Sequence, residues 1–317
     1  MARIPAPVAA VRLAVRHALP DGLALVACSG GADSLALAAA ARFVGRRVGL
    51  VTVDHGLQED SGKRAREVAG WARDRGFDPV EVATVSVAGR PGGPEAAARA
   101  ARYEALSAAA ARLGAGAVLL GHTRDDQAET VLLALARGAG PHGLAGMPFR
   151  RGVFVRPLLD VSRADTRAAC AVLGLQPWDD PHNTDPAYAR SRVRGSALPA
   201  LVAALGPRVV ANLARSAAQI GADNDVLDGL AEQALGRARS AGDAVHVAEL
   251  AGLPPAVRTR VLHAWARRLG APPGDLSHRH IAALDALITG WHGQGPVHLP
   301  GGIAVARRGD ALDRVSG

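Results

Sequence analysis

The first residues that point to chemistry form a short polar loop between an apolar run and an alanine-rich run. The apolar run covers residues 23–28, the loop reads SGGADS (29–34), and a helical pattern covers 34–44. Backbone N–H groups at the start of a helix bind anions, and glycines let a ligand come close to them. A loop of this composition in this setting predicts a site for phosphate or another anion.

The choice among known phosphate-binding loops rests on lysine content and glycine spacing. A Walker loop needs GxxxxGK[ST], but Lys63 is the only lysine in the chain, and the dinucleotide fingerprint GxGxxG has a different spacing. The nucleophile elbow G-x-S-x-G is nearly matched, with Ala27 in the first position, so a serine hydrolase that uses Ser29 is one alternative. SGGxDS is the signature of PP-loop ATP pyrophosphatases, in which amides, hydroxyls and a magnesium ion replace the lysine charge.

A second stretch, residues 121–147, carries three acids at the expected start of a helix. Asp125 and Glu129 are four residues apart and share one helix face, with Asp126 about a quarter turn away. Capping and compensation of the helix dipole account for one such acid, but less readily for three. Beside an ATP site, carboxylates of this kind can hold magnesium, bind an ammonium group, or take a proton from an attacking amine.

The elements that position these two stretches alternate along the first 160 residues. Strands are predicted at 23–28, 48–53, 80–87, 117–121 and 153–156, and helices at 34–44, 61–75, 94–113, 125–137 and 162–173. Continuous apolar strands separated by helices are typical of a doubly wound, mostly parallel sheet, here of five strands. In the order 3-2-1-4-5, the loops after the first and fourth strands face each other, so SGGADS meets the acidic stretch.

The last third of the chain has a different pattern. From about Leu205 the strand signals nearly vanish, and helices are predicted near 207–239, 255–269 and 278–289. We therefore expect an α/β domain over residues 1–200 and a smaller, mainly helical domain over residues 201–317.

Composition narrows the class of partner. The net charge is +8 with a pI near 10.9, which favours a polyanionic partner such as nucleic acid, although a general bias toward arginine gives the same charge. Cys28 and Cys170 form no CxxC pair, which excludes an all-cysteine metal site. The basic N-terminus is typical of an opening amphipathic helix, and no run reaches 18 apolar residues, so we expect a cytoplasmic protein with no membrane contact.

Five blocks of sequence together resemble the tRNA(Ile)-lysidine synthase family of PP-loop enzymes. They are SGGADS, VDHGL (53–57), EAAARAARYEAL (95–106), GHTRDDQAETVLLALARGAGPHGLAGM (121–147), and RPLL (156–159) with DDPHNTDPAYARSRVR (179–194). The resemblance implies ATP-dependent joining of L-lysine to C2 of the wobble cytidine in a tRNA(Ile) with a CAU anticodon. The cytosine C2 oxygen is first adenylated, with loss of pyrophosphate, and the lysine amine then expels AMP. The product, lysidine, changes codon specificity from AUG to AUA and identity from Met to Ile.

The same resemblance assigns roles to residues. The ATP site is expected to contain Ser29, Gly30, Gly31, Ala32, Asp33, Ser34, Asp54, His55, Gly121 and His122. The catalytic residues are expected to be Asp33, Asp125, Asp126, Glu129, Arg99 and Arg192, with the three acids of the second stretch serving the lysine amine. Asp33 and Asp126 are the candidates for contact with Mg²⁺. The 1–200 domain would bind ATP and catalyse, and the 201–317 domain would bind tRNA, with a homodimer as one option for the assembly.

Three other functions stay open beside this one. A PP-loop tRNA thiolase normally uses cysteines to carry sulfur or an iron–sulfur cluster, which two distant cysteines disfavour. A serine hydrolase using Ser29 would react with a fluorophosphonate probe. A nucleic-acid-binding protein without activity would release no pyrophosphate from ATP.

Overall fold

The computed structural model describes residues 4–54, 56, 61–86, 94–179, 185–239 and 243–315. The chain forms two compact units, Met1–Gly221 and Ala222–Gly317, and each is described by itself. The boundary expected near residue 200 lies 21 residues before the division at Gly221, and helix α10 (Arg208–Ala238) contains that division.

The first unit is built on a six-stranded sheet in the order β3-β2-β1-β4-β6-β5. Its strands are β1 (Ala24–Ala27), β2 (Val48–Asp54), β3 (Val80–Thr84), β4 (Ala117–Leu120), β5 (Arg150–Arg151) and β6 (Phe154–Val155). All neighbouring pairs are parallel except β5–β6, which is antiparallel. The predicted parallel order is confirmed, but the predicted count of five is wrong, because the exposed two-residue strand β5 adds a sixth.

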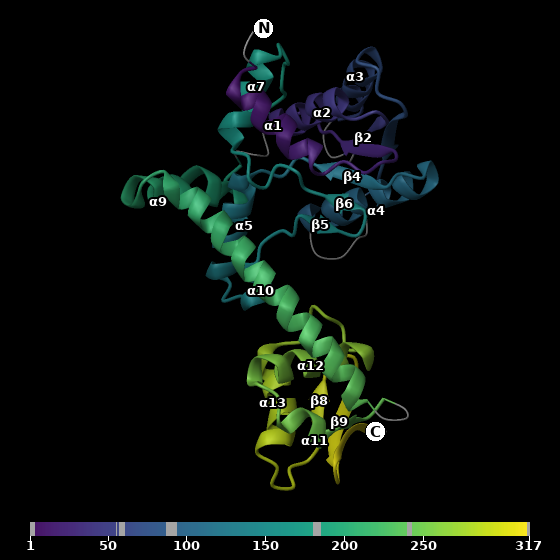
Figure 1. The fold of residues 1–317 in the computed structure, drawn as a ribbon, viewed down its shortest axis with the longest axis vertical. Helices are drawn as coiled ribbons and strands as arrows, with labels where there is room; N and C mark the ends of the chain where they lie inside the picture. The colour runs from purple at the N-terminus through teal and green to yellow at the C-terminus, as the bar shows by residue number, and fades with distance from the viewer. Residues whose placement is uncertain are drawn as a thin grey trace. The chain divides into compact units, whose positions relative to one another are not determined.

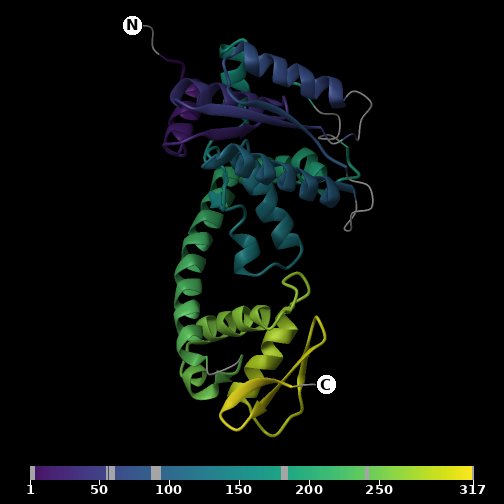
Figure 2. The same cartoon turned by 90° about the vertical axis from the view of Figure 1, so that its right-hand side faces the viewer.

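Helices cover both faces of this sheet (Figures 1 and 2). Alternate residues of β1 point to opposite faces, so Val26 packs with α1 (Ala6–Arg16), α2 (Ala32–Val44), α3 (Ser61–Asp74) and α7 (Arg163–Val172). Leu25, one residue earlier, packs instead with α4 (Pro94–Leu113) on the other face. Because both faces are buried at the centre of the sheet, β1 and β4 are apolar throughout, and this is the pattern that made them visible in the sequence.

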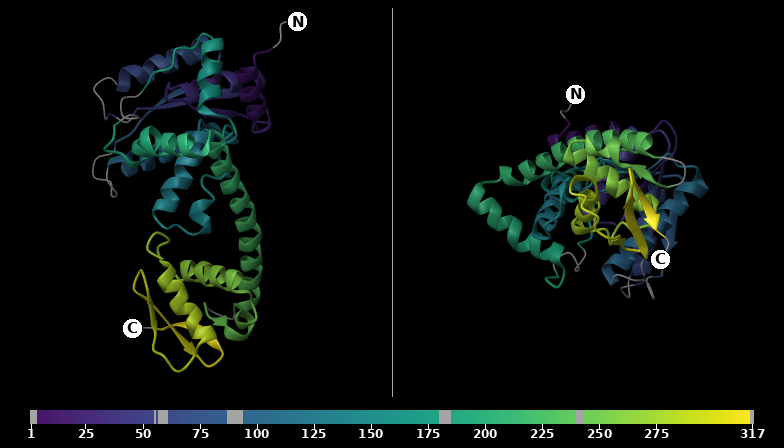
Figure 3. Two further views of the ribbon diagram at one scale, coloured as in Figure 1. Left: turned by 90° about the vertical axis from the view of Figure 1, so that its left-hand side faces the viewer. Right: turned by 90° about the horizontal axis from the view of Figure 1, so that it is seen from below.

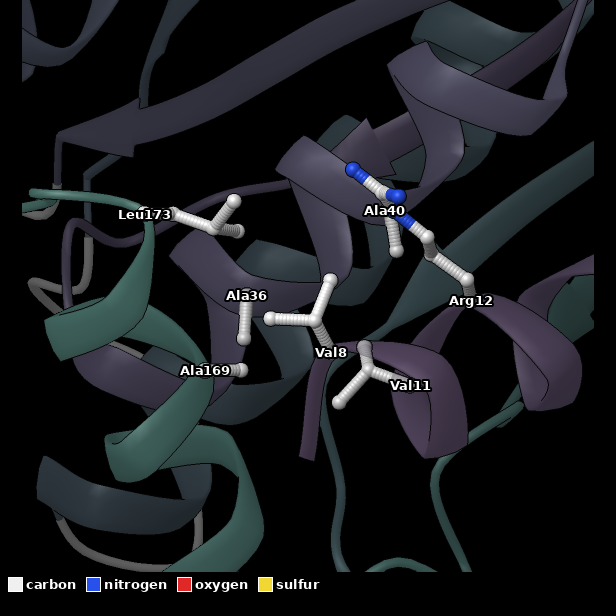
Figure 4. Close-up of a pocket in the computed structure, with 7 residues that line it drawn as sticks. All are labelled: Val8, Val11, Arg12, Ala36, Ala40, Ala169 and Leu173. Atoms are coloured by element: carbon white, nitrogen blue, oxygen red, sulfur yellow. The ribbon is translucent and has the colours of Figure 1, made fainter. Parts of the chain in front are cut away.

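Small residues allow three helices to pack closely on one face. Figure 4 shows Val8 and Val11 of α1 against Ala36 and Ala40 of α2 and Ala169 of α7. The space among them is small and is lined by apolar side chains and one charged residue, Arg12. We therefore look for the functional site at the carboxyl edge of the sheet instead.

The remaining helices of the first unit follow the fourth strand and the sheet edge. They are α5 (Arg124–Ala136), α6 (Pro141–Leu144), α8 (Ala189–Arg192), the π-helical turn Val193–Ala197, and α9 (Leu198–Leu205). Gln127 of α5 holds the segment after α6 through two hydrogen bonds, accepting from the Met147 N–H at 2.8 Å and donating to the Met147 carbonyl at 2.9 Å. Helix α5 also contacts α8 and the π-helical turn, so it is fixed on two sides.

The second unit contains a sheet that sequence patterns did not reveal. Four antiparallel strands have the order β7-β10-β9-β8, with bounds Val245–His246, Ala311–Val315, Ile303–Arg308 and Val297–Leu299. Helix α13 (His278–Thr289) packs on β8 and β9, while α12 (Pro255–Arg268) and α11 (Val247–Ala251) pack against α13 (Figure 3). The predicted helices at 207–239, 255–269 and 278–289 are confirmed, and the unit also contains this four-stranded sheet, which was not predicted.

A membrane-spanning helix is not found as a single element in the described part of the chain. Only one bent pair, Ala189–Leu205 with Arg208–Ala238, passes the test of length and composition, with a bend of 104° between its members.

Candidate active site

The loop after β1 is shaped by Ser34 and Gly30. The Ser34 hydroxyl accepts from the Ser29 N–H at 3.2 Å and donates to the Gly31 carbonyl at 2.9 Å, which closes the loop on itself. Gly30 has φ +86°, a conformation that side-chain-bearing residues rarely adopt, and a Cβ there would lie 3.0 Å from Val68. Helix α2 then begins at Ala32, so its first N–H groups face the predicted phosphate position.

The start of α2 packs directly against the end of β4. A Cβ on Gly121 would lie 3.1 Å from the Asp33 carbonyl carbon and 3.1 Å from the Ser34 nitrogen, so a larger residue would press against the backbone of α2. This contact brings the loops after β1 and β4 together, as the predicted strand order requires. Gly121 therefore has a packing role in addition to any contact with nucleotide.

Helix α5 begins with a capping box that fixes Asp126. Thr123 is fully buried, and its N–H and hydroxyl both donate to Asp126 Oδ2, at 2.8 and 2.9 Å. The Asp126 N–H donates in return to the Thr123 hydroxyl at 3.4 Å. Asp126 thus serves the helix start with one carboxylate oxygen and presents the other, Oδ1, to its surroundings.

Three arginines surround the acids Asp126 and Glu129, and we call this group the arginine cage: Arg163, Arg190 and Arg194. Glu129 is 0% exposed and accepts four hydrogen bonds from them, at 2.7 to 3.1 Å. Asp126 Oδ1 accepts from the same three residues at 2.9 to 3.4 Å. Since a carboxylate has about four acceptor positions, Glu129 has none left in this arrangement.

The cage keeps both acids ionised despite their burial. Burial raises the pKa of Asp126, but Arg163 and Arg190 outweigh it and lower the pKa below its ordinary value. For Glu129, burial again raises the pKa, but the hydrogen bond from Arg194 and the charge of Arg163 outweigh burial, so the pKa lies below its ordinary value. The pair therefore carries two negative charges, matched against three positive ones.

Asp33 is in the opposite situation. Burial is the largest effect on this carboxyl and raises its pKa to about 6, although a hydrogen bond from the buried Thr166 hydroxyl and the charge of Arg163 act in the other direction. Its Oδ2 lies 3.8 Å from Arg163 Nε. The SGGADS loop, called the ATP loop below, therefore contains a carboxylate whose negative charge is not balanced by its neighbours.

His122 lies beside the cage with an open ring nitrogen. Its Nδ1 is buried and has no hydrogen-bond partner among the described residues. Burial and then the charge of Arg102 lower the pKa of His122 to about 3, so the ring is neutral at physiological pH. A neutral imidazole with an unused nitrogen is suited to contact with a nucleotide, in agreement with the role predicted for His122.

Other predicted residues lie outside the cage. Asp54 accepts from the Gly56 N–H at 3.0 Å and the Ser61 hydroxyl at 2.6 Å, so it links the end of β2 to the first residue of α3. His55 lies outside the described residues. Arg99 is exposed, with its guanidinium 5.1 Å from the centre of the Tyr103 ring. Arg192 is also exposed and donates to the carbonyls of Pro186 and Ala187, while its neighbours Arg190 and Arg194 enter the cage.

Asp125 differs from the two caged acids. It is half-buried, and its Oδ2 accepts from the Arg163 N–H at 2.8 Å. Arg163 was missed by sequence reasoning, because one arginine in a chain with 37 lysines and arginines gives no local signal. Its one sequence cue is Ser162, a helix N-cap residue that places Arg163 in the first turn of α7.

Metal-binding groups are limited in the described chain, where no cluster of three His, Cys, Asp or Glu residues could hold an ion. Mg²⁺ commonly binds one or two carboxylates and takes its other oxygens from substrate phosphates and water. The under-neutralised Asp33 fits that arrangement. Asp126 does not fit it here, since both its oxygens are engaged by Thr123 and the cage.

Comparison with known proteins identifies the family. Residues 11–201 match the PP-loop domain, and residues 246–312 match the TilS substrate binding domain. A tRNA(Ile)-lysidine synthase from Salinispora tropica is 64% identical, with 99% of this chain and 98% of that protein covered. One from Thermobifida fusca is 55% identical, with 98% and 96% covered. This chain belongs to the tRNA(Ile)-lysidine synthase family. The family and the ATP-binding PP-loop fold predicted from the sequence are confirmed.

Structural comparison supports the fold of the first unit. The U34-tRNA thiolase NcsA from Methanococcus maripaludis, solved with its [4Fe-4S] cluster, matches with a TM-score of 0.54 and 16% identity. The match covers 68% of this chain and 79% of the thiolase. At this identity the likeness shows a shared fold. Burial raises the pKa of the Cys28 thiol, and burial followed by the charge of Asp33 raises that of Cys170 to about 11, so both thiols are protonated at neutral pH.

Proposed function

We propose that this protein joins L-lysine to C2 of the wobble cytidine in tRNA(Ile) with a CAU anticodon, using ATP and releasing pyrophosphate and AMP. The observation that carries the proposal is the meeting of the SGGADS loop with the acids of α5 at one sheet edge, joined by Arg163. A site for phosphates and a site for an amine are thereby adjacent. Membership in the lysidine synthase family supports the same reaction.

In the first step, the cytosine C2 oxygen attacks the α-phosphorus of ATP and the bond to pyrophosphate breaks. The N–H groups at the start of α2 and the Ser29 hydroxyl are the donors available to the phosphates, since the Ser34 hydroxyl donates to the Gly31 carbonyl. Mg²⁺, when bound, would neutralise phosphate charge, and Asp33 is the residue suited to hold it. His122 would contact the nucleotide through its open nitrogen.

In the second step, the lysine ε-amine attacks C2, and the C–O bond to AMP breaks. Free lysine has a pKa of about 10.4, so an ionised carboxylate must bind the ammonium and help remove one proton as a base. Asp126 and Glu129 have the required charge, but their acceptor positions are filled in the resting arrangement. We infer that Arg190 and Arg194, both partly exposed, turn to phosphates of ATP or tRNA and so free the acids for the amine.

The alternative functions have less support. The Ser29 hydroxyl is 3.3 Å from the Ser34 hydroxyl, and no hydrogen bond joins it to a histidine within the described chain, which disfavours a serine hydrolase. A thiolase needs an ionised cysteine or a cluster with at least three ligands, and the sequence has two cysteines. A homodimer and a cytoplasmic location stay predictions from the sequence.

The deciding experiment follows label from radioactive lysine into RNA. The protein is incubated with ATP, labelled lysine and tRNA(Ile) bearing a CAU anticodon, and nuclease mapping locates the product base. We expect label at the wobble position, dependent on ATP. Asp33→Ala should abolish pyrophosphate release in a folded protein. Label that fails to enter RNA, or normal pyrophosphate release from the variant, would contradict the proposal.

A further inference from the structure

Arg163 is fixed in space by backbone contacts as well as by its side chain. Its N–H donates to Asp125 Oδ2 at 2.8 Å, and the Arg124 N–H donates to the Val161 carbonyl at 2.9 Å. These two bonds tie the beginning of α7 to the beginning of α5. The guanidinium therefore extends from an anchored point between the two helices.

The side chain of Arg163 reaches acids on two different elements. Its Nη2 donates to Asp126 Oδ1 at 2.9 Å and to Glu129 Oε1 at 3.1 Å, while Nε lies 3.8 Å from Asp33 Oδ2. A planar guanidinium offers several donors in a fixed fork, whereas a lysine ammonium is a compact point charge. The guanidinium is therefore better suited than an ammonium to hold carboxylates on two sides at a set separation.

The next turn of α7 adds a second contact to the ATP loop. Thr166 is fully buried and donates its hydroxyl to Asp33 Oδ1. Helix α7 therefore holds Asp33 through Thr166 and faces both Asp33 and the α5 acids through Arg163. Without the guanidinium, three carboxylates would approach one another with less shared positive charge.

We propose that Arg163 is a positioning residue shared by the two half-reactions. It holds Asp33 of the ATP loop and the Asp126–Glu129 pair in one arrangement, so that the adenylated base forms where the lysine amine is delivered. The inference rests on the proposed function, because it assigns one residue to both the adenylation and the amine transfer.

The test measures each half-reaction separately in Arg163→Gln and Arg163→Lys. Adenylation is read as tRNA-dependent pyrophosphate release without lysine. Transfer is read as single-turnover decay of isolated adenylated tRNA over a range of lysine concentrations. Arg167→Gln is the matched control, since Arg167 lies one turn along α7, is exposed, and pairs with the surface acid Asp179 at 2.8 Å.

We expect Arg163→Gln to lower both maximal rates by about 10- to 100-fold, the loss typical of a misplaced reacting group. The half-saturating lysine concentration should stay the same or fall, because a competing cation has been removed. Arg163→Lys should recover part of both rates, and Arg167→Gln should stay within about twofold of the parent protein. If Arg163 only stabilised the fold, its loss would not lower the maximal rates while leaving lysine affinity unchanged. The Arg163→Lys variant would then not recover these rates either.

Several results would overturn the inference. One is loss of a single half-reaction with the other intact, and another is an equal loss in Arg167→Gln. If Arg163→Gln does not fold, as judged by thermal unfolding, the Lys variant decides by the same separation of rate from lysine affinity. If the parent protein transfers no lysine, the proposed function itself fails. Transfer by the parent with unchanged Arg163→Gln rates refutes only the role of Arg163.

Discussion

Asp33→Asn should make the ligand-free protein more stable at neutral pH while removing its activity. Asp33 is three-quarters buried, and burial raises its pKa to about 6 from 3.8. Because the folded pKa is above the unfolded one, the ionised carboxylate opposes folding above about pH 6. The difference of about two in pKa corresponds to roughly 3 kcal/mol at about pH 8. Asparagine keeps the size of the side chain and a partner for Thr166 without the charge.

The pH dependence gives this prediction its sign. As the pH falls below about 6, the folded protein takes up a proton that the unfolded chain does not, so the wild type gains stability relative to the variant. The advantage of Asp33→Asn should shrink from roughly 3 kcal/mol at about pH 8 to about half of that at pH 5, and little of it should remain at pH 4. For a unit of this size, the advantage at pH 8 corresponds to about 5–10 °C in Tm.

The assay is urea or thermal unfolding with a metal chelator present, at several pH values. Asp160→Asn is the control, since Asp160 is an exposed carboxylate in the same unit and should change stability little. Adding ATP and Mg²⁺ should stabilise the wild type and reduce the difference, because ligands that bind the folded state raise its stability. The reasoning is refuted if Asp33→Asn gains nothing at pH 8, or gains equally at pH 4.

Three further predictions concern the cage and the RNA. Glu129→Gln should lower lysine transfer by about 10²- to 10⁴-fold, the range for loss of an acid–base group, while pyrophosphate release changes much less. Equal loss of both activities, restored by extra magnesium, would assign Glu129 to metal binding instead. Calorimetric titration of lysine into the ligand-free protein should give little binding, and a non-hydrolysable ATP analogue with tRNA should strengthen it; tight binding to the free protein would contradict exchange of the arginines. Binding of tRNA should weaken steeply between about 50 and 200 mM salt, and a flat affinity would argue against contacts dominated by phosphate.

Sequence patterns predicted the first unit well because its strands are buried on both faces. Short apolar runs such as β1 and β4, each followed by a glycine-containing loop, are typical of buried strands, and the loop order followed from their alternation with helices. The two-residue strand β5 escaped notice because Arg150 and Arg151 are exposed and carry no strand signal. It forms only because the chain turns back on β6 at the sheet edge.

The second unit was harder to predict for a related reason. Strand β9 buries Ile303 and Val305, but its other residues are only partly exposed until Arg308. Strand β10 buries only Leu312 fully. Such short alternating runs are weak beside the clear periodicity of α12 and α13. The signal that was available is the turn chemistry, since Gly301, Gly302 and Gly309 have positive φ and sit between the strands.

The site shows the same division between local and tertiary information. The acids of α5 follow from their spacing, which places them on one face of a helix start. The pairing of these acids with arginines does not follow, because Arg190, Arg194 and Arg163 come from segments 34 to 68 residues away. In an arginine-rich chain only the fold distinguishes these three from Arg192, whose guanidinium binds nearby carbonyls instead.

The charges of the ligand-free site suggest how one site can bind both a polyanion and a cationic amine. The α5 acids are saturated with arginine, so an ammonium gains little by approaching them, whereas Asp33 lacks positive charge and is suited to a cation brought with ATP. Phosphates that arrive first would draw arginines from the cage and thereby uncover the acids. On this reasoning, binding of the polyanion creates the amine site. Lysine would then reach C2 only when the base beside it is ready for attack.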